Sequence, residues 1–243
     1  MKLLILIFLF CLLVNSAFAW DLSSFQSELV SPWTTSARNV LYAGGGLTLA
    51  VIAFEDSIVD PTQHEMANHK PLGYFSKLGD LSGQVVPNLL YILTQTSLGL
   101  SGDQGASNRA AGMMKATLYA SGVTTMLKYS VREPRPGSRD RNSFPSGHTT
   151  TAFAFSGYIY EEHGLQWGIP AFMVSAFVGA SRINDNRHYL HDVLAGATIG
   201  LAYGVGISKL SQIKHESNKQ TGQMFVVPIL DEKTKGLALI KEF

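Results

Sequence analysis

Cysteine and charge are the two scarce features of this 243-residue chain. Its single cysteine, Cys11, lies in the first hydrophobic run, so the chain cannot form an internal disulfide or a thiolate metal cluster. Charged residues make up 15% of the sequence and the formal net charge is +1, which argues against nucleic acid as a partner. Hydrophobic residues make up 46%, enough for a large buried core.

The first nineteen residues predict an export signal. Lys2 supplies a positive charge, residues 3–14 form an unbroken apolar run, and residues 17–19 read AFA, a small-x-small cleavage pattern. Cleavage there would remove the only cysteine, which suits an oxidising compartment. We therefore predict a signal peptide over residues 1–19 and an exported protein, in the periplasm or on the periplasmic face of the inner membrane.

Long apolar segments with little proline predict an all-α domain of about six core helices over residues 20–210. The expected helices cover residues 39–54, 81–102, 110–127, 148–160, 165–180 and 192–210. The tail, residues 211–243, has a different pattern. There, apolar segments at 224–230 and 236–243 flank a polar turn, which predicts a β-hairpin appended to the helical domain.

Three short segments carry the residues of a candidate site. They are residues 128–136 (KYSVREPRP), 145–148 (PSGH) and 181–192 (SRINDNRHYLHD). Together they supply three permanent cations, two imidazoles, a hydroxyl and a carboxylate from Lys128, Arg135, Ser146, His148, Arg182, His188 and Asp192. Such a density of cations needs an anion, and planar guanidinium groups match the oxygens of phosphate. Two histidines nearby indicate that the anion is transformed as well as held.

The spacing predicts that these segments meet at one end of the helical domain. An antiparallel pair of helices over residues 148–160 and 165–180 returns the chain, so that His148 and Arg182 lie at the same end. Residues 188–192 then lie where a loop enters the next helix. Ser146 and Gly147 lie at a helix N-terminus, where free backbone N–H groups form a natural anion site.

The three segments resemble the signature motifs of the type 2 phosphatidic acid phosphatase (PAP2) superfamily, which also contains class A acid phosphatases and vanadium haloperoxidases. The family pattern reads K-x6-RP, PSGH and SR-x5-H-x3-D, and every fixed position is present here in order. The resemblance covers roughly residues 110–208 and implies a PAP2-type helical bundle with phosphatase activity.

The chemistry of the residues and this resemblance imply the same roles. His188 would attack phosphorus and form a phosphohistidine, with Asp192 orienting its ring. His148 would protonate the leaving alkoxide and later help to activate water. The phosphate oxygens would be held by Lys128, Arg135, Ser146, Gly147 and Arg182. No metal and no cofactor are expected, because the cations take the place of a metal.

The length of the apolar segments bears on membrane attachment. Lipid-acting members of the superfamily are typically six-helix membrane proteins, whereas the acid phosphatases are soluble bundles. The charge-free stretches at 39–54, 164–181 and 193–208 hold 16, 18 and 16 residues, and a membrane span wants about 20. These lengths favour a periplasmic domain that is soluble or only peripherally attached.

Several alternatives stay open from the sequence alone. The expected substrate is a lipid phosphate such as phosphatidic acid, with membrane association, but a soluble phosphomonoester fits the same residues. A vanadium haloperoxidase and a non-catalytic lipid-binding module are further readings. His188, His191 and Asp192 have the H-x-x-H-D spacing of metal ligands, although no further cluster completes a shell. His191 is expected to be structural, and no protein partner is indicated.

Overall fold

The computed structural model describes residues 22–220, 224–230 and 235–241, so the predicted signal peptide at 1–19 lies outside the described residues. The helices are α2 (Leu22–Leu29), α3 (Ser31–Thr34), α4 (Arg38–Ala53), α5 (Asp60–His69), α6 (Ser76–Gly83), α7 (Val86–Leu100), α8 (Gln104–Val131), α9 (Gly147–His163), α10 (Leu165–Asn184) and α11 (Leu190–Gln220). A π-helical turn at Glu55–Val59 precedes α5, and a 3-10 turn at Gly73–Phe75 precedes α6.

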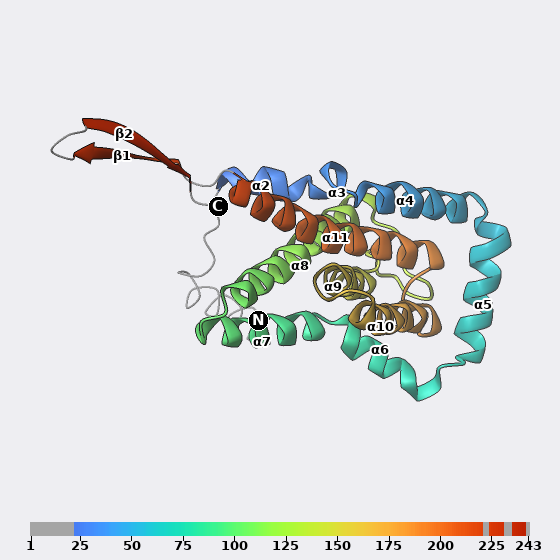
Figure 1. The fold of residues 1–243 in the computed structure, drawn as a ribbon. Helices are drawn as coiled ribbons and strands as arrows, with labels where there is room; N and C mark the ends of the chain where they lie inside the picture. Colours follow the sequence, from blue (N-terminus) through green and yellow to red (C-terminus); the bar gives the residue numbers. More distant parts are fainter. Residues whose placement is uncertain (1–21, 221–223, 231–234, 242–243) are drawn as a thin grey trace.

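Helix α9 is the centre of the bundle. It packs against α8, α10 and α11, while α7 lies against α8 and α4 lies against α11 (Figure 1). The core between these helices is formed by Ile92, Met113, Ala116, Tyr119, Ala120, Ala154, Tyr158, Ile159, Ala171, Tyr203 and Ile207. The expected all-α bundle is therefore confirmed.

Glycine lets α11 approach α9 so closely that backbones touch. A Cβ at Gly196 would lie 2.5 Å from the carbonyl oxygen of Ser146, and one at Gly200 would lie 2.2 Å from that of Thr150. Gly204 repeats the pattern against Ala154. These glycines recur every four residues along one face of α11, and small residues at this spacing allow close helix packing. The start of α11 is thereby held against the start of α9.

Most predicted helices extend beyond their expected ends, and one prediction is wrong. The expected helix at 81–102 is two helices, because Gln84 has extended backbone angles and α7 begins only at Val86. Pro87 lies in the first turn of α7, where its missing N–H costs no hydrogen bond. Helix α11 continues past residue 210, the expected end of the domain, to Gln220.

The segment between α4 and α7 closes one end of the bundle (Figure 1). No helix is expected from the sequence over residues 55–80, which make up most of this segment. Two hydrogen bonds to side chains join it to the end of α10 and to the loop that follows. Gln63 Nε2 donates to Asn186 Oδ1 at 2.5 Å, and the Leu72 backbone N–H donates to Asn184 Oδ1 at 3.0 Å. This segment therefore lies beside the loop that carries His188.

Two antiparallel strands follow the helices, where the sequence analysis expects a hairpin. They are β1 (Met224–Leu230) and β2 (Lys235–Lys241), and their register pairs Met224 with Lys241 and Leu230 with Lys235.

Candidate active site

The three sequence segments meet in one cavity of about 280 Å³. Its lining is formed by Asp80, Lys128, Arg135, Gly147, His148, Arg182, Arg187 and His188. Four of these side chains, three arginines and a lysine, carry a positive charge at neutral pH, and one is a carboxylate. The cavity is therefore a strongly electropositive, half-enclosed site of a size that suits a phosphate group with part of its ester.

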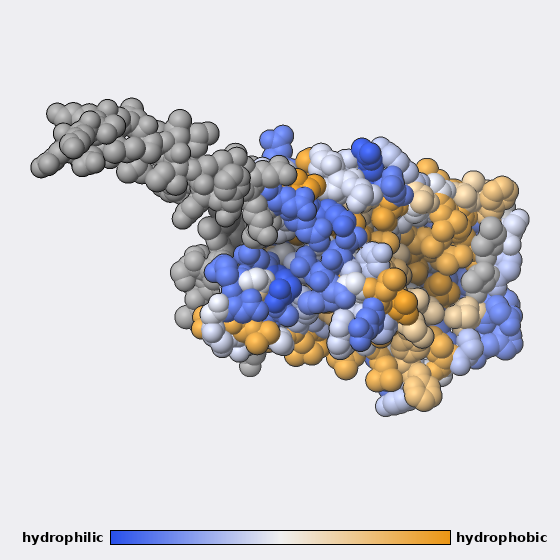
Figure 2. All heavy atoms as spheres, viewed as in Figure 1, coloured by the Kyte–Doolittle hydropathy of each residue, from blue (hydrophilic) through white to orange (hydrophobic). Residues whose placement is uncertain are grey.

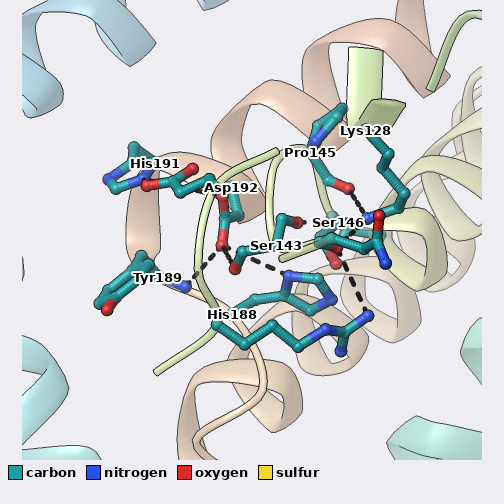
Figure 3. Close-up of polar contacts among 12 residues, drawn as sticks. Lys128, Ser143, Pro145, Ser146, His188, Tyr189, His191 and Asp192 are labelled. Atoms are coloured by element: carbon teal, nitrogen blue, oxygen red, sulfur yellow. Dashed lines mark hydrogen bonds and ion pairs between the residues drawn. The ribbon is translucent and has the colours of Figure 1, made fainter. Parts of the chain in front are cut away.

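His188, which lines the cavity, forms a buried pair with Asp192 behind it. His188 Nδ1 lies 3.3 Å from Asp192 Oδ2, and the same oxygen accepts hydrogen bonds from Ser143 Oγ at 2.5 Å and from the Tyr189 backbone N–H at 2.8 Å (Figure 3). Because Oδ2 is an acceptor, it selects the tautomer with the proton on Nδ1. Nε2 of His188 then keeps a free lone pair.

The surroundings of this pair set both charges. Burial lowers the pKa of His188, and the hydrogen bond and charge of Asp192 oppose this only in part. Burial alone would raise the pKa of Asp192, but His188, Ser143 and the Tyr189 N–H outweigh it, and its pKa is lowered. At neutral pH the imidazole is therefore neutral and the carboxylate ionised, as a histidine nucleophile requires.

His148, at the start of α9, lies across the cavity in a different environment. Burial lowers its pKa to about 4, the charge of Arg182 adds to this effect, and Asp80 opposes it. A negative group placed beside the ring would raise this pKa again, because an opposite charge favours the imidazolium form. The proton affinity of His148 therefore depends on what occupies the cavity.

Asp80 of α6 is a cavity residue that the sequence analysis missed. Its Oδ1 accepts a hydrogen bond from Arg182 Nη1 and lies 3.2 Å from His148 Nε2. Burial raises the pKa of Asp80, but the hydrogen bond and charge of Arg182 outweigh it, and the pKa is lowered. Asp80 precedes Arg182 by 102 residues, so no local spacing points to it. The sequence signal that could indicate it is an acidic residue next to Gly79 and one turn before Gly83, because two small residues one helical turn apart mark a closely packed helix face.

Lys128 organises the loop between α8 and α9 as well as lining the cavity. Its ammonium group donates to the carbonyl oxygens of Asn142, Ser143 and Pro145 at 2.8, 3.2 and 2.5 Å (Figure 3). Burial lowers its pKa to about 8, and the nearby charge of Arg135 contributes. These hydrogen bonds hold the start of the PSGH segment, and the loop before it, against the end of α8.

The two expected arginines differ in how firmly they are held. Arg182 is almost fully buried, with 4% of its side chain exposed, and faces Asp80 on one side and Asp185 at 3.6 Å on the other. Arg135 pairs through Nε with Asp140 at 2.9 Å inside its own loop. Of the weaker candidates, Arg187 lines the cavity, whereas Arg141 donates to the Arg132 carbonyl.

Ser146 and Gly147 are placed differently from each other. Gly147 lines the cavity at the start of α9. Ser146 is fully buried, its hydroxyl accepts a hydrogen bond from Thr149 Oγ1 at 2.9 Å, and it is not part of the lining. Its backbone N–H donates to the Asp192 carbonyl at 3.0 Å. Ser146 therefore joins the second motif to the third from behind the cavity.

His191 pairs with a residue of the first motif. Its Nε2 lies 2.8 Å from Glu133 Oε1 and 3.7 Å from Asp192 Oδ1, and its ring stacks on Tyr189 with centroids 5.4 Å apart. Burial lowers the pKa of His191, but Glu133 and Asp192 outweigh it and the pKa is raised. The H-x-x-H-D spacing is thus explained by two hydrogen-bonded pairs, His188 with Asp192 and His191 with Glu133. Glu133, His191 and Asp192 each offer a ligand atom within 4.8 Å of the others, and these pairs already account for their arrangement.

The loops of this helical bundle bring four cations and a histidine–aspartate pair to one cavity, an arrangement that suits the binding and transfer of a phosphate group. Residues 110–216 match the family model of the PAP2 superfamily. The chain thus carries a PAP2 domain, and the resemblance read from the three motifs is confirmed.

Named relatives of this domain are phosphatases. The chain is 33% identical to lipid A 1-phosphatase of Porphyromonas gingivalis over 138 residues, which are 54% of this chain and 30% of that protein. It is 29% identical to lipid phosphate phosphatase 2 of Arabidopsis thaliana over 133 residues, 37% of this chain and 46% of that protein. The chain thus spans less than half the length of both relatives.

Two crystal structures share the fold. LpxE of Aquifex aeolicus superposes with a TM-score of 0.50 at 23% identity, over 63% of this chain and 96% of that one. A transmembrane PAP2-type phosphatidylglycerolphosphate phosphatase from Bacillus subtilis superposes with a TM-score of 0.54 at 18% identity, over 71% and 96%. Almost the whole of each of these proteins is matched, so the bundle described here is their common fold.

Proposed function

We propose that this protein is a metal-independent phosphatase that hydrolyses phosphomonoesters, with lipid phosphates as its substrates. The observation that carries the proposal is the cavity in which four cations surround His188 while Asp192 orients its ring. Fixed cations of this kind stabilise the charge on the three equatorial oxygens during phosphoryl transfer.

The proposed reaction has two steps. Nε2 of His188 attacks phosphorus, the bond from phosphorus to the ester oxygen breaks, and His148 gives its proton to the leaving alkoxide. Water then attacks phosphorus while His148 accepts a proton from it, the bond from phosphorus to His188 Nε2 breaks, and inorganic phosphate leaves. Bound phosphate supplies the negative charge that raises the pKa of His148 from about 4 and makes it an effective acid.

In this proposal Arg135, Gly147 and Arg182 hold the phosphate oxygens, with Arg187 as a further cation of the lining. Lys128, also expected to bind phosphate, already donates to three loop carbonyls, so it contributes its positive charge to the cavity. The Ser146 hydroxyl, also expected to bind phosphate, is buried behind the cavity. In this proposal Ser146 acts through its backbone N–H, which donates to the Asp192 carbonyl.

Lipid phosphates are proposed because of the apolar surface next to the site. Large hydrophobic side chains are exposed on α4, α7 and α10, and Figure 2 shows hydrophobic residues gathered over the half of the molecule that holds α4 and α10. Monomeric soluble proteins rarely expose apolar patches of this extent. Relatives named as lipid phosphatases favour the same substrate class.

Membrane contact is proposed on the same surface. Among the described residues, one helical segment, Leu190–Lys214, is long and apolar enough to cross a membrane, and most of it is buried inside the bundle. We propose that the protein lies at the periplasmic face of the inner membrane and is exported by residues 1–19, with a phosphatase domain over residues 20–210 and a tail over 211–243.

The test is phosphate release by purified protein in EDTA, with phosphatidic acid in detergent micelles compared with p-nitrophenyl phosphate. We expect turnover of both, with the lipid preferred. Preference for the soluble ester would instead make this an acid-phosphatase-like enzyme, and activity that disappears in EDTA would contradict the metal-independent mechanism.

The matched control is His188→Ala, which removes the nucleophile but leaves the cationic lining in place. We expect it to abolish turnover and the acid-labile phosphoenzyme. Normal turnover by this variant would exclude His188 as the nucleophile.

A further inference from the structure

One oxygen of Asp80 contacts two of the groups that the proposed mechanism assigns to the substrate. Oδ1 accepts a hydrogen bond from Arg182 Nη1 and lies 3.2 Å from His148 Nε2. In that mechanism Arg182 holds a phosphate oxygen and His148 protonates the leaving oxygen. A carboxylate oxygen and a phosphate oxygen are both anionic acceptors of similar size, so both cannot occupy this position.

The close packing of α6 fixes the backbone position of Asp80. A Cβ at Gly79 would lie 2.3 Å from Ser181 Oγ, and one at Gly83 would lie 2.8 Å from His148 Cβ. The helix is therefore seated directly on α10 and on the start of α9. Because Gly79 lies against Ser181, the next residue of α6, Asp80, lies beside the next residue of α10, Arg182.

The side chain of Asp80 has more freedom than its partners. It is 47% exposed, whereas Arg182 is 4% exposed. Its second oxygen, Oδ2, has only a long contact of 3.5 Å from Gln84 Nε2. A change of χ1 rotamer turns the carboxylate towards water without moving α6. The buried guanidinium of Arg182 stays, and a buried cation needs another anion in place of the one it loses.

We propose that Asp80 is an internal competitor of phosphate for Arg182 and His148. The phosphate dianion displaces the carboxylate when substrate binds. After hydrolysis the carboxylate returns to Arg182 and promotes the release of inorganic phosphate. Asp80 therefore sets how tightly this enzyme holds its product, a role that rests on the proposed phosphatase function and goes beyond it.

The test compares binding of inorganic phosphate by wild-type protein, Asp80→Asn and Asp80→Ala, measured by titration calorimetry. Both variants remove a negative charge that faces the bound dianion, and like charges in contact are strongly unfavourable. We expect both variants to bind phosphate at least about tenfold more tightly than wild type. Product inhibition of p-nitrophenyl phosphate hydrolysis should strengthen by the same factor.

The matched control is Asp185→Asn, which removes a carboxylate 3.6 Å from Arg182 Nη2 that does not line the cavity. We expect it to leave phosphate affinity within twofold of wild type. Unchanged or weaker phosphate binding by both Asp80 variants would overturn the proposal, and so would an equal gain in Asp185→Asn. Calorimetry needs no turnover, so this result is separate from the outcome of the hydrolysis assay that tests the phosphatase function.

Discussion

Two histidines of the same cavity are given different chemistry by their neighbours. His188 has an ionised carboxylate behind one ring nitrogen, at 3.3 Å from Asp192, which prepares the other nitrogen to attack. His148 lies beside Arg182, and its pKa falls to about 4 through burial and that cation. In the proposed mechanism the first ring is therefore the neutral nucleophile, and the second becomes an acid only when an anion lies next to it.

This difference predicts a dependence on the leaving group. In His148→Ala, the leaving alkoxide receives no proton from the enzyme, so kcat for an alkyl phosphate should fall by about 10²–10⁴-fold. p-Nitrophenyl phosphate, whose leaving group hardly needs a proton, should lose far less. Steady-state rates for the two substrates check this, and an equal loss on both would show that His148 has another role.

At the residue scale, the sequence was informative where a residue lay inside a motif. Lys128, Arg135, Gly147, His148, Arg182 and His188 were all chosen from the sequence and all line one cavity. Asp80 was missed because helix packing, and no sequence spacing, brings it there. Ser146 was expected at the substrate, but burial turns its hydroxyl towards Thr149, a direction that a motif does not specify.

Single helices followed the hydrophobic pattern well, because long apolar runs without proline form helices once they can be buried. The exception is informative. Residues 81–102 carry no charged side chain, yet the helix is interrupted at Gln84, three residues before Pro87. The interruption allows α6 to lie on α10 while α7 lies on α8, and this requirement of packing is not visible in a hydrophobic pattern.

The contact between α9 and α11 gives a prediction at this scale. Gly200→Ala would place a methyl group 2.2 Å from the Thr150 carbonyl oxygen, so the two helices must separate. We expect a loss of about 1–3 kcal/mol in the free energy of unfolding. Denaturant titration measures it.

Gly122→Ala is the matched control in the same experiment. Gly122 lies inside α8, and its added methyl group would meet no atom within 4 Å. We expect the free energy of unfolding of this variant to rise by about 0.4–1 kcal/mol, because alanine leaves the unfolded chain fewer conformations than glycine does. A destabilisation equal to that of Gly200→Ala would refute the close-packing explanation.

On the face of the molecule drawn in Figure 2, the two halves differ in character. Figure 2 shows hydrophilic residues over the half that contains α2 and the end of α11, and hydrophobic residues over the half that contains α4 and α10. On α10, Trp167 and Met173 are 62% and 69% exposed. Exposed side chains of this size are stabilised when a lipid phase covers them.

This asymmetry predicts binding to vesicles. Wild-type protein should float with phosphatidylcholine vesicles in a density gradient, and the double variant Trp167→Gln, Met173→Gln should lose at least about tenfold in partition. Ile213→Gln, which removes an exposed apolar residue near the end of α11, serves as the control and should float like wild type. Equal flotation of all three proteins would contradict membrane contact through α10.

The carboxylate of Asp192 orients His188 and accepts Ser143, while its peptide carbonyl accepts the N–H of Ser146. One residue therefore fastens the loop before α9 to the start of α11 through two separate chemical groups. If an Asp192 variant is inactive, the loss of activity combines two causes, a displaced loop and a misoriented His188. By contrast, a substitution of His188 leaves both fastenings intact, so it separates catalysis from assembly of the site.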